Sequence, residues 1–420
     1  MENSTTKKNW KRTFFLFWAS QLISLLGSML VQFTLVWWLT EKTGSATVLA
    51  IATMVALIPE IIIQPFAGAI VDRLNRKTVI ITADAIIAAA TLGLGILFYF
   101  DRVEVWLIYT VMVLRAIGGA FHFPAQMASV SLMVPEKQLA RIAGLNQAAR
   151  GIMNIISAPL GALMLEYLGA QSAMLVDVIT AAAAISIVTF ITIPMQQKLE
   201  KRDKSWFGTI LQDMKEGYQY LVSWKGLMVL TAIVLIFKIA LTPAFSLIPL
   251  LVYKHLHGNA AQYSMVDVVG GIGIILGGLV LGAWGGFKKN VYTMILGGCG
   301  VGVGILLMGF LPEGEFLWIL PIIFLVGFMI PIVDGPIHAV LQAKIDNEYQ
   351  GRVTTLFGSI INLSGPIGLA AAGPLSDTFG LQIWFITAGI LIFAMMLLGS
   401  FNKHLMNIDK GPEANGLANG

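Results

Sequence analysis

The chain has 420 residues, of which 57% are hydrophobic and 12% are charged, and its mean hydropathy is +0.79. A soluble chain must expose many of its residues to water, and about a quarter of them are charged. The composition therefore excludes soluble, disordered, collagen-like and coiled-coil proteins. The net charge of +4 does not indicate nucleic-acid binding, and the single cysteine, Cys299, excludes an internal disulfide and a thiolate metal cluster. We expect a membrane protein without metal or cofactor.

Apolar runs recur along the whole chain, and each is long enough for a helix to cross a bilayer, which takes about 20 residues. There are twelve, approximately residues 13–39, 46–71, 77–100, 105–133, 142–168, 172–194, 226–252, 263–286, 291–311, 316–342, 353–372 and 381–401. The first run is too long for the apolar part of a cleaved signal peptide. The pattern predicts an all-α membrane protein with twelve transmembrane helices.

Lysine and arginine residues lie almost entirely in alternate connections. If the N-terminus is cytoplasmic, 21 of them fall in inner segments and 3 in outer segments. Basic residues flanking membrane spans are retained on the cytoplasmic side. The distribution predicts a multi-pass protein of a plasma membrane, in a bacterial cell, with both termini in the cytoplasm.

The two halves of the chain resemble each other. Shifts of 214 or 211 residues match Gly44 with Gly258, Ala46 with Ala260, Arg141 with Arg352 and Gly169 with Gly380. We therefore expect two pseudo-symmetric bundles of six helices, the architecture of a transporter with its site between repeats. The expected parts are a bundle over 1–194, a linker over 195–225 with an amphipathic surface helix, a bundle over 226–402 and a cytoplasmic tail over 403–420.

Two short motifs carry a family resemblance. The connection between the second and third runs reads GAIVDRLNRK (68–77) and resembles motif A of the major facilitator superfamily. Asn75 replaces its second glycine, and we expect it in a left-handed turn. In the fourth run, LRAIGG (114–119) resembles motif B, whose arginine is associated with proton coupling. The resemblance implies the major facilitator fold and transport driven by an ion gradient.

Longer stretches resemble the macrolide-efflux group of these drug:proton antiporters. They are WLTEKTGSA (38–46), RAIGGAFHFPA (115–125), VPEKQL (134–139), GGFKKNV (285–291) and GRVTTLFGSIINLSGPIGL (351–369). The resemblance implies export of hydrophobic drugs, macrolides among them. An exporter of a natural product such as a siderophore, or an importer of the same fold, remains the alternative.

Motif A supplies the residues of an expected conformational latch. Its members are Gly68, Asp72, Arg73, Arg76, Lys77 and, on the fifth run, Arg141. Gly68 would let a neighbouring helix approach closely. Asp72 could pair with Arg76 or Arg141 and release that contact when the bundles move.

Eight ionisable residues lie inside the apolar runs, where a charge costs at least about 2.5 kcal/mol. Glu60, Gln64, Gly68 and Asp72 share one helical face because they are spaced by four residues. We expect Glu60 to couple proton movement through an ion pair with Arg115 or Arg150. Asp84 is a further candidate for the proton relay, and a structural ion pair is the alternative.

Other polar residues within the runs are candidates for a substrate cavity. They are Asp334, Lys238, Gln64, His122 and His338. Lys238 could pair with Asp334, and Pro331 and Pro336 predict a broken helix around Asp334. We expect Asp177 and Asp267 to reach the membrane surface from near their helix ends, and Trp37 and Trp38 to lie in an interfacial belt.

The connections hold no catalytic group of residues and no phosphate-binding loop, so neither an enzyme nor an ATP-driven pump is expected. The predicted function is proton-coupled efflux. The expected partners are a small hydrophobic substrate, a proton and the lipid bilayer, with a monomer as the working unit.

Overall fold

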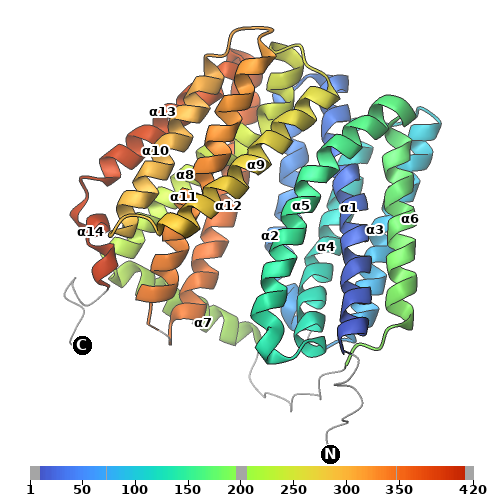
Figure 1. Ribbon diagram of the computed structural model, residues 1–420, viewed down its shortest axis with the longest axis horizontal. Coiled ribbons are helices and arrows are strands. Elements are labelled where there is room, and N and C mark those ends of the chain that lie inside the picture. Colours follow the sequence, from blue (N-terminus) through green and yellow to red (C-terminus); the bar gives the residue numbers. More distant parts are fainter. Residues whose placement is uncertain (1–9, 72, 195–205, 347, 412–420) are drawn as a thin grey trace, which may run out of the picture. The chain divides into compact units, whose positions relative to one another are not determined.

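A computed structural model describes residues 10–71, 73–194, 206–346 and 348–411 (Figure 1). Every regular element in these ranges is helical, and twelve of the helices are long and apolar enough to cross a membrane. The prediction of an all-α protein with twelve spans is confirmed.

The twelve long helices form two sets of six along the chain. The first set is α1 (Trp10–Thr43), α2 (Ala46–Val71), α3 (Arg76–Tyr99), α4 (Val105–Met133), α5 (Glu136–Leu168) and α6 (Ala170–Phe190). The second is α8 (Lys225–Leu250), α9 (Ala260–Trp284), α10 (Asn290–Gly309), α11 (Ile319–Lys344), α12 (Gln350–Phe379) and α13 (Leu381–Gly399). Shorter elements are α7 (Trp206–Ser223), α14 (Lys403–Met406), the π-helical turn Leu251–His255 and the 3-10 turns Phe316–Trp318 and Ile408–Lys410.

The helices divide into two compact units, which do not follow the chain strictly. The first unit comprises residues 1–43, 52–201 and 260–268, and the second comprises 44–51, 202–259 and 269–420. The first turns of α2 therefore belong to the second unit, and the first turns of α9 belong to the first unit.

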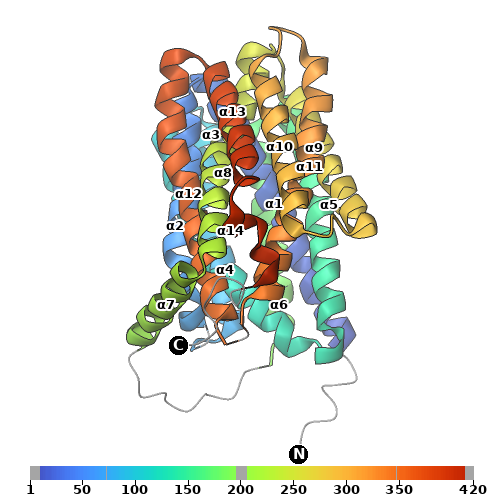
Figure 2. The same cartoon turned by 90° about the vertical axis from the view of Figure 1, so that its left-hand side faces the viewer.

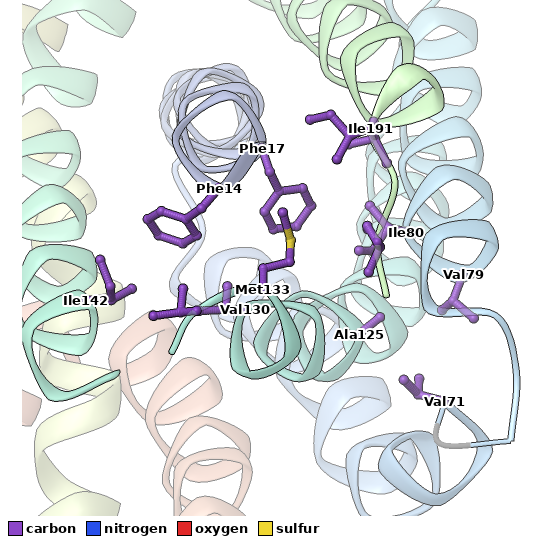
Figure 3. Close-up of a cluster of buried hydrophobic side chains, with 13 residues drawn as sticks. Phe14, Phe17, Val71, Val79, Ile80, Ala125, Val130, Met133, Ile142 and Ile191 are labelled. Carbon is purple, nitrogen blue, oxygen red and sulfur yellow. The ribbon is translucent and has the colours of Figure 1, made fainter. Parts of the chain in front are cut away.

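In the first unit, α1 packs against α5 and α6, and α3 packs against α4 and α6. Side chains from several of these helices meet at the end of the unit where α1 begins (Figure 3). Phe17, Ile80 and Ala125 are fully buried there, and Met133 lies beside Phe17. This apolar cluster closes one end of the bundle.

In the second unit, glycines let helices approach closely, as expected for the runs that carry them. A Cβ on Gly273 of α9 would lie 2.5 Å from the carbonyl oxygen of Phe324 on α11. A Cβ on Gly302 of α10 would lie 2.8 Å from the backbone nitrogen of Phe393 on α13. Only glycine fits at either position, because a Cβ would collide with the backbone of the neighbouring helix. Small residues of this kind let helices pack closely in a membrane.

The prediction of a broken helix around Asp334 is wrong. α11 continues without interruption through Pro331 and Pro336. Each proline lacks one backbone N–H, but neighbouring helices and local adjustments of the helix make proline tolerable in membrane spans.

The linker contains the helix α7, which packs against α8 and α12 (Figure 2). Glu216 forms an ion pair of 2.7 Å with Arg352, and the Tyr220 hydroxyl donates to Asp346 Oδ2 at 3.1 Å. Burial, with the carboxylate of Asp346 beside it, raises the pKa of Tyr220, so the phenol stays protonated and remains a donor. The linker helix is thus fixed to the second unit.

Candidate functional site

A buried ion pair lies at the centre of the first unit. Arg115 Nη1 of α4 is 2.6 Å from Asp177 Oδ2 of α6, and the aspartate side chain is only 1% exposed. The same guanidinium donates to the Thr91 hydroxyl and, at 3.3 Å, to the carbonyl oxygen of Ser28. The Ser28 hydroxyl donates to Asp177 Oδ1 at 3.0 Å. We call these four residues from α1, α3, α4 and α6 the Arg115 network.

Two expectations about these residues are corrected. Arg115 pairs with Asp177 and not with Glu60, and Asp177 is buried and does not reach the membrane surface. α6 packs against α1 and α3, the helices that carry Ser28 and Thr91, so Asp177 faces the arginine directly. Pairing and hydrogen bonding offset the cost of burying both charges.

Glu60 and Arg150 also lack the ion pair that was expected. Glu60 is half-buried and accepts a hydrogen bond of 3.4 Å from Gln64 Nε2, one turn along α2. The Arg150 guanidinium lies over the ring of Phe123, 5.3 Å from its centroid. A cation over an aromatic face is stabilised without a carboxylate. Within the described residues no salt bridge joins Glu60 to either arginine.

Asp84 and His122, which the sequence placed in separate roles, face each other. His122 Nε2 of α4 is 3.2 Å from Asp84 Oδ1 of α3, with side-chain exposures of 19% and 6%. This contact does not have the geometry of a hydrogen bond, so His122 Nε2 has no hydrogen-bond partner among the described residues. The other carboxylate oxygen, Asp84 Oδ2, has none there either. A titratable pair in the membrane-spanning part of a protein is a candidate for proton transfer.

The motif A residues are only partly visible, since Asp72 lies outside the described residues. Asn75 has a φ of −71° and accepts a hydrogen bond from the Lys77 backbone nitrogen, so it caps α3 and does not form the expected left-handed turn. Arg76 donates to the Ala128 carbonyl at 3.0 Å, and Lys77 Nζ donates to the Thr189 and Ile191 carbonyls at 2.6 and 3.0 Å. These contacts fix the start of α3 to the ends of α4 and α6.

The other latch candidates are open in this conformation. A Cβ on Gly68 would meet no atom within 4 Å, so the close helix contact expected there is not made. Arg73 and Arg141 are exposed.

The cavity candidates of the second unit do not form the expected ion pair. Lys238 Nζ lies 6.0 Å from the ring centroid of Phe237, and no salt bridge to Asp334 occurs among the described residues. Asp334 is half-buried, and His338, one turn further on α11, is exposed. The described ranges also contain no cluster of three His, Cys, Asp or Glu residues that could bind a metal.

Two groups of contacts were missed by the sequence analysis. Asp377 on α12 accepts hydrogen bonds from the Ser45 hydroxyl and the Ala46 nitrogen at 2.7 Å, and from the Thr47 nitrogen at 3.0 Å. Tyr263 on α9 lies between two aromatic rings of α1 and donates to Asp267, four residues further on, which is exposed. The spacing of Tyr263 and Asp267 is a usable signal, whereas nothing local connects Asp377 to Ser45.

The fold agrees with the comparisons to known proteins. The model of the Major Facilitator Superfamily matches residues 17–369. The chain belongs to this superfamily. Macrolide efflux protein A of Streptococcus pyogenes is 33% identical over 401 residues, which cover 96% of this chain and 98% of that protein. The Multidrug efflux pump Tap of Mycobacterium tuberculosis is 26% identical over 391 residues, 90% of each chain.

Solved transporters share the fold at low sequence identity. A nucleoside transporter matches with a TM-score of 0.68 and 13% identity, covering 92% of this chain and all of that one. A POT family transporter matches with a TM-score of 0.71 and 12% identity, covering 92% and 95%. This superfamily member is therefore a multi-pass membrane transporter and not an enzyme.

Proposed function

We propose that this protein exports hydrophobic drugs of the macrolide class across the plasma membrane. The observation that carries the proposal is the similarity to Macrolide efflux protein A, which extends over 96% of this chain and 98% of that protein. Similarity over all twelve spans preserves both helical units and their connections, as transport of a related substrate requires.

The energy for export comes from the proton gradient. The first unit holds ionisable groups within its spans, among them Glu60, Asp84, His122 and the Arg115 network. Such groups are costly in a membrane and are kept where they move ions or protons. The buried Arg115–Asp177 pair fixes four helices, and a titratable group near it takes up and releases the proton.

Alternating access is the proposed movement. The substrate site opens to each side of the membrane in turn as the protein changes conformation. The motif A residues, with Asp72 and Arg141, form a latch that stabilises one of the two end states. Gly68, which is open in the present conformation, receives its neighbouring helix in the other state.

The test is a drug-susceptibility panel in a bacterial host that lacks its own efflux pumps. Expression of the chain should raise the inhibitory concentration of macrolides, and an uncoupler should remove the effect, since it collapses the proton gradient. Arg115→Gln should lose resistance, whereas the exposed Arg102→Gln serves as the matched control and should keep it. Asp72→Asn in the same assay tests the latch.

The direction of transport is decided by uptake of labelled macrolide into everted membrane vesicles. An exporter accumulates the drug when the vesicle interior is acidified. An unchanged susceptibility panel, with the protein present in the membrane, would discard macrolide export.

A further inference from the structure

The Asp84–His122 pair lies at a defined depth in the first unit. From three members of the Arg115 network, Ser28, Thr91 and Arg115, a step of seven residues along the helix, about two turns, leads to Gln21 on α1, Asp84 on α3 and His122 on α4. Consecutive spans run in opposite directions, so these three steps lead toward the same end of the unit (Figure 1). The three side chains therefore lie at a similar depth, and we call them the second polar layer.

This second layer differs from the first in its hydrogen bonding. The Arg115 network connects its charged groups through short hydrogen bonds. In the second layer, Gln21 Oε1 and Nε2, Asp84 Oδ2 and His122 Nε2 are all buried, with no hydrogen-bond partner among the described residues. Buried polar atoms are almost always satisfied in folded proteins. A layer with several unsatisfied atoms is thus suited to bind a small polar species.

Apolar layers enclose the second polar layer on both sides. On the side of the Arg115 network, Ile87 packs against Gly118, where an added Cβ would lie 2.7 Å from Ile87 Cγ1. On the other side lie the fully buried Phe17, Ile80 and Ala125 (Figure 3). Only His122 keeps an appreciable exposed fraction, 19% of its side chain. The imidazole is thus the most exposed part of the layer.

The charged groups around the pair are few. α3 carries no other ionisable residue between Lys77 and Tyr99, and α1 carries none between Arg12 and Glu41. From α4 and α6 the nearest are Arg115 and Asp177, which neutralise each other. From α5 comes Arg150, whose guanidinium lies over Phe123, the neighbour of His122. No fixed countercharge contacts the Asp84 carboxylate among the described residues.

We propose that Asp84 and His122 together hold the proton that drives transport. This inference rests on the proposed function and names the group that binds its coupling ion. A neutral imidazole beside a carboxylate has a net charge of −1. One proton from water, forming an N–H or an O–H bond, makes the pair neutral, and the reverse step returns the proton to water.

The net charge of the pair explains how its occupancy would affect the conformation. Without its proton the pair is a buried anion, which low-polarity surroundings disfavour. With the proton it is neutral and stable between its apolar layers. Release of the proton therefore requires a conformation in which water reaches the pair, and this requirement links proton release to movement of the units.

The first experiment needs no substrate. Infrared difference spectra of the purified protein between mildly acidic and alkaline pH should show a carboxyl band that Asp84→Asn removes and His122→Gln changes. Glu60→Gln and the exposed Asp101→Asn should leave that band in place. An unchanged band in Asp84→Asn, in a variant that is eluted and melts like the parent protein, overturns the inference whether or not the protein transports macrolides.

The second experiment uses proteoliposomes and labelled erythromycin. Asp84→Asn and His122→Gln should lose accumulation driven by a pH gradient and lose macrolide-dependent proton flux, yet keep exchange of macrolide between the two sides. Loss of exchange as well would indicate a structural role and contradict the inference. Gradient-driven transport that survives in Asp84→Asn and disappears in Glu60→Gln would assign the proton to Glu60. Failure of the parent protein to bind erythromycin would reject the proposed substrate, with the infrared result still deciding the proton site.

Discussion

The first turns of α2 and of α9 occupy equivalent places in the two repeats. α2 begins at Ala46 and α9 at Ala260, which differ by the repeat offset of 214 residues. Residues 44–51 group with the second unit and residues 260–268 with the first. Each repeat therefore contributes the start of one helix to the other unit. The same helix start is exchanged in both halves of the chain.

The α2 start is held by polar contacts and close packing. Asp377 accepts hydrogen bonds from the Ser45 hydroxyl and from the Ala46 and Thr47 backbone nitrogens. A carboxylate at this place satisfies free N–H groups and interacts favourably with the helix dipole. Gly373 packs against the same turn, where an added Cβ would lie 2.8 Å from Thr47 Cα.

The α9 start is held by aromatic rings. Tyr263 is stacked between Phe33 and Trp37, with ring centroids 5.3 and 5.7 Å apart and interplanar angles of 14° and 16°. Trp37 is buried, and the prediction that it lies in an interfacial belt is wrong. The ring of Tyr263 thus stacks with two aromatic rings of α1.

The difference shows that a duplicated backbone does not require duplicated chemistry. A carboxylate cap depends on charge, and water can replace the hydrogen bonds that it accepts. A ring stack depends on contact area, and nothing small can replace it. We therefore expect the α2 start to detach from its unit more readily than the α9 start, and the following variants test that order.

Tyr263→Ala should have the largest effect, because it removes both ring contacts. The expected loss of stability is about 3 kcal/mol, as for other large-to-small aromatic changes. Tyr263→Phe is the matched control, since it keeps the stack and removes only the hydroxyl that contacts Asp267. Thermal unfolding of the purified protein measures both. Equal losses in the two variants would show that the hydroxyl, and not the stack, holds the α9 start.

Gly373→Ala should have the next largest effect, because the new methyl group would collide with the α2 backbone. Overpacking of this kind costs about 2 kcal/mol. Gly278→Ala on α9 is the control, since a Cβ there meets no atom within 4 Å. The control should be neutral or slightly stabilising in the same unfolding assay, because alanine favours helix. If Gly373→Ala is as stable as the control, close packing at Gly373 does not stabilise the α2 start.

Much of the fold could be predicted from the sequence, because span length and hydropathy determine a membrane helix directly. The starts of α2 and α9 were predicted within a few residues for the same reason. The failure at Pro331 and Pro336 has a physical cause, since proline interrupts a helix less when neighbouring helices stabilise it. The exchange of helix starts between units was not predictable, because it depends on which distant side chains meet.

The site was predicted as a set of residues but not as a set of contacts. Asp84, His122 and Arg115 were identified because charge is rare in membrane spans. The partner expected for Arg115 was wrong, since hydropathy places a residue along the membrane normal but says little about which neighbouring helix it faces. Asp377 was missed because it lies near the end of α12, where a charge costs little and gives no signal.

Asp377→Ala should have the smallest effect on stability, because the cap lies at an exposed end of α12. Loss of a helix cap costs about 1 kcal/mol. Asp377→Asn should cost less, since the amide oxygen still accepts a hydrogen bond although the charge is lost. The control is Glu166→Ala, at an exposed position within α5. The difference between the α2 and α9 starts predicts a second result. Asp377→Ala should change macrolide transport more than its small loss of stability implies, because it weakens the helix start that we expect to detach more readily. Transport in proteoliposomes, measured beside thermal unfolding, decides this. If transport by Asp377→Ala equals that of the parent protein, Asp377 only satisfies the hydrogen bonds at the start of α2. The starts of α2 and α9 then differ in their contacts but not in their effect on transport.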